Sequence, residues 1–207
     1  HYIGNYEKAF AYLNDLYNRF NLQRYWVFQP ERFSAVVMDT YRTAFSKEEY
    51  DYIIKQQIDG NRFPLSKTDQ EMVSYWTAES LRYGLRARDA IKVYLKELER
   101  QGHSPEGERR LLMGLTNAYL SIGDHFRARM TQDYFFARYH STVDQLDHLL
   151  AMAEIDRLAG NLKAAINSYE QALALSGEER QKLEIGSNLG QIYYRLERYD
   201  DVVTFEP

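Results

Sequence analysis

The chain has 207 residues, of which 44% are hydrophobic and 27% charged, and its formal net charge is −4. This composition is typical of a folded protein and excludes a wholly disordered one, while the lack of a basic block argues against general nucleic-acid binding. The sequence contains no cysteine, which excludes disulfides, thiolate metal sites and cysteine nucleophiles, and no apolar stretch is long enough to insert in a membrane.

Residues 1–67 are the least regular part of the chain, and we interpret them as divergent N-terminal hairpins. A turn at Gly4 precedes one predicted helix over 5–20. Further on, Ser46-Lys47-Glu48-Glu49 has the form of a capping box, with Phe45 and Tyr50 placed to form a hydrophobic staple. The sequence therefore predicts a helix that begins after Ser46.

A turn signal recurs along the rest of the chain. Gly123-Asp124 and Gly160-Asn161 each precede an Ala that lies five positions after the Gly, and Gly4 has the same pattern. Looser copies fall at positions 85 and 197, so the spacings (85 to 123, 123 to 160, 160 to 197) are 38, 37 and 37 residues. Gly adopts the left-handed conformation that ends a helix, and Asn or Asp caps the next one. Each period therefore predicts two antiparallel helices.

Apolar residues three and four apart run upstream and downstream of each turn, and no stretch alternates long enough to predict a strand. Helix starts are predicted from capping boxes at Thr68, Ser141 and Ser176, and from the cap Ser104 before a first-turn proline. The predicted fold is all-α, a single domain over 1–207. Its repeats span 68–103, 104–141 and 142–179, and a truncated repeat spans 180–207.

We expect this sequence to be part of a longer protein, because its last residues read as an interrupted helix and it lacks an initiator Met. The sequence does not fix the compartment, since both cytosolic and exported proteins can lack cysteine.

The repeated residues resemble the tetratricopeptide repeat (TPR) family, whose period is about 34. The family prefers a Leu-Gly pair, alanines and aromatics at set places in each repeat. Those places are filled here by Ala78, Ala90, Tyr94, Leu115, Tyr119, Ala128, Ala153, Ala165, Tyr169, Ala172, Leu189, Gly190 and Tyr193. The departures are Asp156, where Tyr is usual, Gln132, where an aromatic is usual, and a longer period.

The resemblance implies hairpins stacked into a right-handed superhelix, an α-solenoid in which the first helix of each hairpin lines a concave groove. Carried over by position, the predicted groove residues are Tyr75, Glu79, Arg82, Tyr83, Arg110, Met113, Asn117, Glu154, Arg157, Ser187, Gln191 and Tyr194. Aromatics, Arg and amides suit a peptide partner. The family's carboxylate clamp is not expected, because Met113 stands where its Lys should be.

A metal site is the main alternative for chemistry. His140, Asp144, Asp147 and His148 would share one face of a continuous helix. However, Ser141 and Asp144 read as a capping box, which places His140 before the helix begins. His103 and His125 fall at predicted turns, where we expect them to face solvent.

No phosphate loop, nucleophile elbow or His-Glu-x-x-His motif is present. The sequence therefore predicts a non-catalytic scaffold that binds a protein or peptide and takes no cofactor. Two other functions remain open: a regulatory input domain of a larger bacterial signal-transduction protein, and a module for homo-oligomerisation through an uncapped terminal hairpin.

Overall fold

The computed structural model describes residues 30–56 and 65–196, together with Lys8 and Ala11. The predicted helix over 5–20, the turn at 197 and most of the last truncated repeat lie outside the described residues. Within the described ranges every regular element is a helix. The helices pack in neighbouring pairs, so the all-α prediction is confirmed for the part of the chain that is described.

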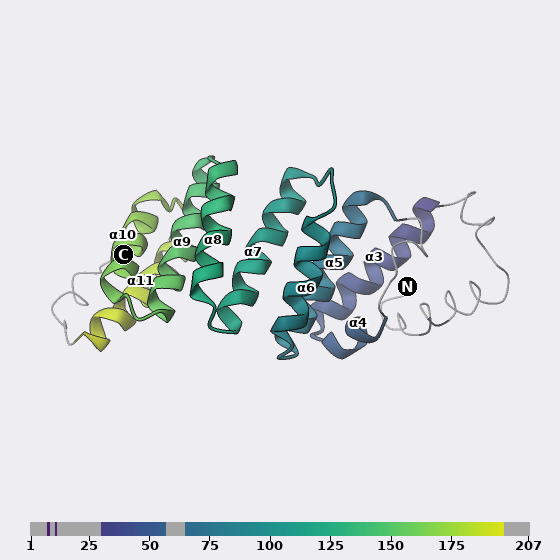
Figure 1. The fold of residues 1–207 in the computed structure, drawn as a ribbon, viewed down its shortest axis with the longest axis horizontal. Helices are drawn as coiled ribbons and strands as arrows, with labels where there is room; N and C mark the ends of the chain where they lie inside the picture. The colour runs from purple at the N-terminus through teal and green to yellow at the C-terminus, as the bar shows by residue number, and fades with distance from the viewer. Residues whose placement is uncertain (1–7, 9–10, 12–29, 57–64, 197–207) are drawn as a thin grey trace. The chain divides into compact units, whose positions relative to one another are not determined.

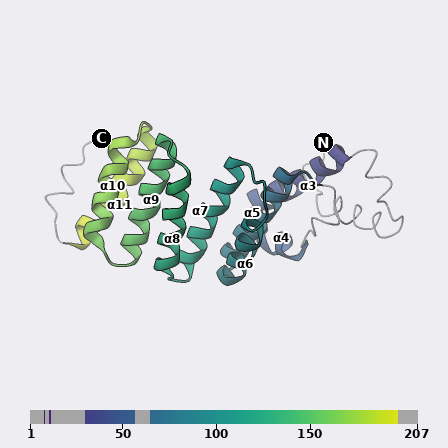
Figure 2. The ribbon, with the colours of Figure 1, turned by 45° about the horizontal axis from the view of Figure 1, so that its top comes forward.

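The described residues up to Ala118 form one compact unit, and those from Tyr119 onward form a second. Unit 1 contains α3 (Pro30–Ser46), α4 (Tyr50–Gln56), α5 (Lys67–Tyr83), α6 (Ala87–Leu98) and most of α7 (Pro105–Ser121). In Figures 1 and 2, α3, α4 and α5 lie against one another, and α6 runs back along α5. A core of Tyr41, Ile53, Trp76 and their neighbours holds α3, α4 and α5 together.

Unit 2 begins with the last turn of α7 and contains α8 (His125–Arg138), α9 (Thr142–Leu158), α10 (Leu162–Leu175) and α11 (Glu179–Arg195). The helices α9, α10 and α11 lie side by side in both ribbon views (Figures 1 and 2). Their shared core includes Ala165, Tyr169, Ile185 and Leu189.

The turn prediction is confirmed at three places. Leu85, Gly123 and Gly160 have φ values of 60°, 74° and 82°. After each, the next backbone N–H donates to the carbonyl five residues earlier, as in Arg86 to Leu81 at 2.8 Å. This bond satisfies a carbonyl that the end of the helix leaves open. Leu85 adopts the left-handed conformation without being a glycine, which costs on the order of 1 kcal/mol.

The Ala that follows each turn is fully buried, as the spacing predicts. Ala90, Ala128 and Ala165 each have 0% exposure. A larger side chain at these positions would force the two helices of the hairpin apart.

The predicted helix starts divide into two groups. Ser141 caps α9 with a complete capping box through Asp144, and the Ser104 hydroxyl accepts from the N–H of Gly107 at 3.0 Å. These two predictions are confirmed. The cap of α5 is Ser66, which accepts from the N–H of Asp69, so the prediction of Thr68 is wrong by two residues.

The capping boxes predicted at Ser46 and Ser176 are also wrong, because both residues end a helix. Ser46 is the last residue of α3, and its hydroxyl donates to the Thr43 carbonyl at 2.9 Å. Ser176 follows α10, and its hydroxyl donates to Oε1 of Gln181 at 2.8 Å. The predicted contact of Phe45 with Tyr50 does form, with ring centroids 5.7 Å apart.

Candidate functional site

A buried group of three polar side chains joins α5 to α6. The guanidinium of Arg82 donates twice to the carboxylate of Glu79, at 3.0 and 2.6 Å, and the hydroxyl of Tyr94 donates to Glu79 Oε1 at 2.6 Å. The Glu79 side chain is only 5% exposed. The carboxylate can be buried because these three hydrogen-bond donors replace the water molecules that would otherwise solvate it.

The α9/α10 hairpin carries the same three residue types at the same spacing. Arg157 donates to both carboxylate oxygens of Glu154, at 2.7 and 2.6 Å, and the Tyr169 hydroxyl donates to Glu154 Oε2 at 3.3 Å. The Glu154 side chain is 36% exposed. The sequence carries a signal for both triads, Glu-x-x-Arg followed by Tyr fifteen residues after the Glu (79 to 94, 154 to 169).

Both triads hold their donors in the protonated form. Burial is the largest cause that raises the pKa of each tyrosine, followed by the negative charge of the neighbouring Glu. The pKa of Tyr169 rises to about 12. Hydrogen bonding to the paired carboxylate raises the pKa of Arg82 and of Arg157. These groups therefore stay in one charge state near neutral pH and are poorly suited to proton transfer.

A cavity of about 260 Å³ lies between α9 and α11, and we name it the α9–α11 cavity. Seven residues of α9, α10 and α11 line it: Leu150, Glu154, Tyr169, Gln181, Glu184, Ile185 and Asn188. Leu150 and Ile185 supply apolar wall, and the rest supply carboxylate, amide and hydroxyl groups. Glu184 lies exposed at this cavity, whereas Glu154 is already paired with Arg157.

The same region of unit 1 is closed. The helix α7 is equivalent to α11, displaced by 74 residues (105 to 179), so Gly107 and Gly114 stand where α11 has Gln181 and Asn188. A Cβ on Gly114 would lie 2.3 Å from the Tyr94 hydroxyl, and one on Gly107 would lie 1.9 Å from Glu71 Oε2. The glycines let α7 approach the α5/α6 triad closely. At the same positions α11 has the longer side chains of Gln181 and Asn188, and both line the open α9–α11 cavity.

The predicted groove residues of unit 1 are mostly engaged with one another. Besides the Glu79–Arg82 pair, the guanidinium of Arg110 lies 5.8 Å from the centre of the Tyr75 ring. Tyr83 is 49% exposed and stacks on Tyr50 with centroids 5.0 Å apart. Met113 is half-buried, and Asn117 is exposed.

In unit 2, Glu154 is the predicted groove residue that lines the cavity. Ser187, Gln191 and Tyr194 lie exposed on α11, on the row of side chains beside the one that holds Glu184. Sequence reasoning missed the other residues that line the cavity. Two of them lie close to predicted residues on the same helix: Leu150 is four residues before Glu154, and Glu184 is three residues before Ser187. Their role in binding, like that of the predicted residues, stays a prediction.

The histidines do not assemble a metal site within the described ranges. Asp144 is buried in the capping box, and His140 is exposed. His148 stacks on Phe136 with centroids 4.4 Å apart, and burial lowers its pKa. Among the described residues, no group of three or more His, Asp or Glu is placed to hold a metal ion.

His103 lies at a turn, but the prediction that it faces solvent is wrong. Its side chain is 8% exposed, with Nδ1 at 3.2 Å from Glu71 Oε1 and Nε2 at 2.8 Å from the Glu97 carbonyl oxygen. Ser104 also donates to the Glu71 carboxylate, from its backbone N–H and its hydroxyl. The imidazole is buried because it joins the α6–α7 connection to α5.

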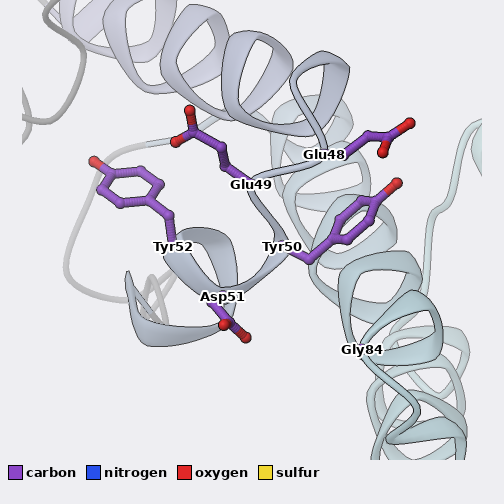
Figure 3. Close-up of a pocket in the computed structure, with 6 residues that line it drawn as sticks. All are labelled: Glu48, Glu49, Tyr50, Asp51, Tyr52 and Gly84. Carbon is purple, nitrogen blue, oxygen red and sulfur yellow. The ribbon is translucent and has the colours of Figure 1, made fainter.

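A second hollow, of about 470 Å³, lies along residues 48–52 beside Gly84. Figure 3 shows Glu49 and Tyr52 on one side of this segment, Glu48 and Tyr50 on the other, and Asp51 turned away from both. The three carboxylates do not converge on one point, as a cation or catalytic site would require. The α9–α11 cavity is therefore the better candidate site.

No protein-family model matches this sequence, and no curated protein matches it significantly. Across the parts of the chain that the structure describes, no helix combines the length and apolar character needed to cross a membrane.

Proposed function

We propose that this chain is a non-catalytic binding module of the TPR type, which receives a basic side chain of a partner peptide in the α9–α11 cavity. The observation that carries the proposal is the contrast between this cavity and the closed equivalent region of unit 1. In unit 1 the equivalent helix α7 packs directly against the triad. The fold therefore does not require the opening beside α11.

The size of the cavity favours a peptide over a small organic ligand. Sites for drug-sized molecules usually measure about 300–1,000 Å³, whereas this cavity measures about 260 Å³. One or two side chains fill such a volume. The exposed side chains of Ser187, Gln191 and Tyr194 continue along α11 and provide polar and aromatic contacts for the rest of a peptide.

The charge of the cavity favours a basic side chain. Arg157 offsets the charge of Glu154, which leaves the carboxylate of Glu184 as the net charge at the cavity. A lysine places its methylene stem on apolar walls such as Leu150 and Ile185 while its ammonium reaches a carboxylate at the rim. The neighbouring amides of Gln181 and Asn188 supply further acceptors.

The proposal is tested by selecting a phage-displayed peptide library on the chain and measuring the affinity of the selected peptides by fluorescence anisotropy. We expect peptides enriched in Lys or Arg. Glu184→Lys should weaken their binding by about tenfold or more, because a like charge then meets the basic side chain. The matched control, Glu99→Lys, makes the same change at an exposed position of unit 1 and should leave binding unchanged. Selection of no peptide, or equal binding by both variants, would contradict the proposal.

A further inference from the structure

Three large apolar side chains form an exposed row on α8. Phe126, Met130 and Tyr134 are 73%, 56% and 51% exposed. They lie four residues apart, so they occupy successive turns on one side of the helix. Single exposed apolar residues are ordinary, but an uninterrupted row marks an interaction surface.

The equivalent rows of the neighbouring hairpins are polar. Thirty-eight residues earlier (88 to 126), α6 has Arg88, Lys92 and Lys96, and 37 residues later (126 to 163), α10 has Lys163, Asn167 and Gln171. All six of these side chains are exposed. The fold therefore presents this row to solvent in each hairpin, and it does not need apolar residues there.

The opposite side of α8 already supplies its packing. Ala128, Gln132 and Phe135 are fully buried, and they correspond to buried residues of α6 and α10. Because the core contacts of α8 come from that other row, the row of Phe126, Met130 and Tyr134 is left for a contact outside the hairpin.

Three exposed charged side chains of α8 border the row: Arg127, Asp133 and Arg138. Arg127 lies on one flank of the row and Asp133 on the other. Arg138, four residues after Tyr134, lies at the end of the row, where its guanidinium is 3.5 Å from the Tyr134 hydroxyl. Arg127 pairs with Asp124 at 3.3 Å, but its side chain is 63% exposed, so this pair is weak and the guanidinium is accessible to a carboxylate of a partner. A partner with acidic residues matches these two arginines at the edges of the row.

We propose that the outer face of α8 docks an amphipathic helix of another protein, with apolar residues on the row and acidic residues against Arg127 and Arg138. This surface is independent of the α9–α11 cavity, and it adds a second partner to the proposed function. Helix docking of this kind uses anchors at successive turns, as the row provides.

The probe is a fluorescent helical peptide of about four turns, with leucines on one face and glutamates on the flanks; a second probe has lysines in place of the glutamates. We expect the parent chain to bind the acidic probe more tightly than the basic one. The triple variant Phe126→Lys, Met130→Asn, Tyr134→Gln gives α8 the polar row of α10. Its affinity for the acidic probe should be lower than that of the parent by about tenfold or more. Its thermal stability should match that of the parent, because the changed side chains are exposed.

A second variant, Arg127→Glu with Arg138→Glu, keeps the row and should reverse the preference between the two probes. Equal binding of the acidic probe by the parent and the row variant, or no binding by the parent, overturns the proposal. A marked loss of thermal stability in the row variant also overturns it, since the row would then be covered by the protein itself. So does a parent dimer that becomes monomeric in that variant, because the occupant would be a second copy.

Discussion

The regions between α5 and α7 in unit 1 and between α9 and α11 in unit 2 are built from equivalent positions but differ in how tightly they close. In unit 1, Gly114 lets α7 approach the Tyr94 hydroxyl, and the Glu79 side chain is 5% exposed. In unit 2, Asn188 replaces that glycine, and Glu154 is 36% exposed at a cavity. The Glu–Arg–Tyr triad is thus a structural cross-link of the hairpin, and the following helix decides whether a ligand has access to it.

The largest difference between the two regions should appear when each Glu is removed. Glu79→Ala leaves a half-buried guanidinium and a buried tyrosine hydroxyl without their acceptor, so we expect it to lower the free energy of unfolding by about 3 kcal/mol. Glu154→Ala should cost only about 1 kcal/mol, because the Glu154–Arg157 pair is partly exposed to water (36% and 27% of the two side chains). Urea denaturation followed by circular dichroism measures both. Equal losses in the free energy of unfolding would mean that the two triads are equally shielded from water.

The second test adds a Cβ to each helix that packs over a triad. Gly114→Ala forces a methyl group toward the Tyr94 ring, where overpacking costs about 1–3 kcal/mol. Gly190→Ala, on α11, is the matched control, because a Cβ there meets nothing within 4 Å. Removal of a helical glycine at such a place should stabilise the protein by about 0.5–1 kcal/mol. If Gly114→Ala were also stabilising, the closed packing of α7 on Tyr94 would be wrong.

The sequence predicts the local features of this fold better than its open spaces. The turns at Gly123 and Gly160 and the buried alanines after each turn follow from backbone conformation and side-chain volume, which the residue type determines directly. The turn at Leu85 was predicted from the repeat spacing alone, because leucine disfavours its positive φ. Capping boxes are a weaker signal. A Ser followed three residues later by an acid occurs at Ser46 and Ser176 as well, where the hydroxyl ends one helix instead of starting the next.

The candidate site was only partly predictable, because a cavity depends on the distance between helices. The repeat pattern predicted that Glu154 faces the groove side of α9, and this residue does line the cavity. The sequence of α11 alone does not indicate that Asn188 lines a cavity. The turn spacings of 37 and 37 residues already pair Asn188 with Gly114 (114 to 188), but they do not give the distance between the helices. The triads, in contrast, were present in the sequence as a repeated spacing and could have been found.

The smallest effect concerns the tyrosine of the open triad at alkaline pH. In an unfolded chain a tyrosine loses its proton near pH 10, whereas burial and Glu154 raise the pKa of Tyr169 to about 12. Between these values the unfolded state releases a proton that the folded state retains. The stability contributed by Tyr169 is therefore complete below about pH 10 and is lost as the pH rises toward about 12.

Tyr169→Phe removes this group, so the free energy of unfolding should fall less steeply with pH in the variant than in the parent over that window. At neutral pH the variant should be less stable by about 1 kcal/mol, because the hydrogen bond to Glu154 is gone. Tyr94→Phe should change the slope in the same direction, since the pKa of Tyr94 is also raised. Urea denaturation at pH 9, 10, 11 and 12 measures the slopes, with the remaining tyrosines common to all three proteins. Parallel slopes in parent and variants would show that neither hydroxyl keeps its proton in the folded state, which would contradict the hydrogen bonds of Tyr94 to Glu79 and of Tyr169 to Glu154.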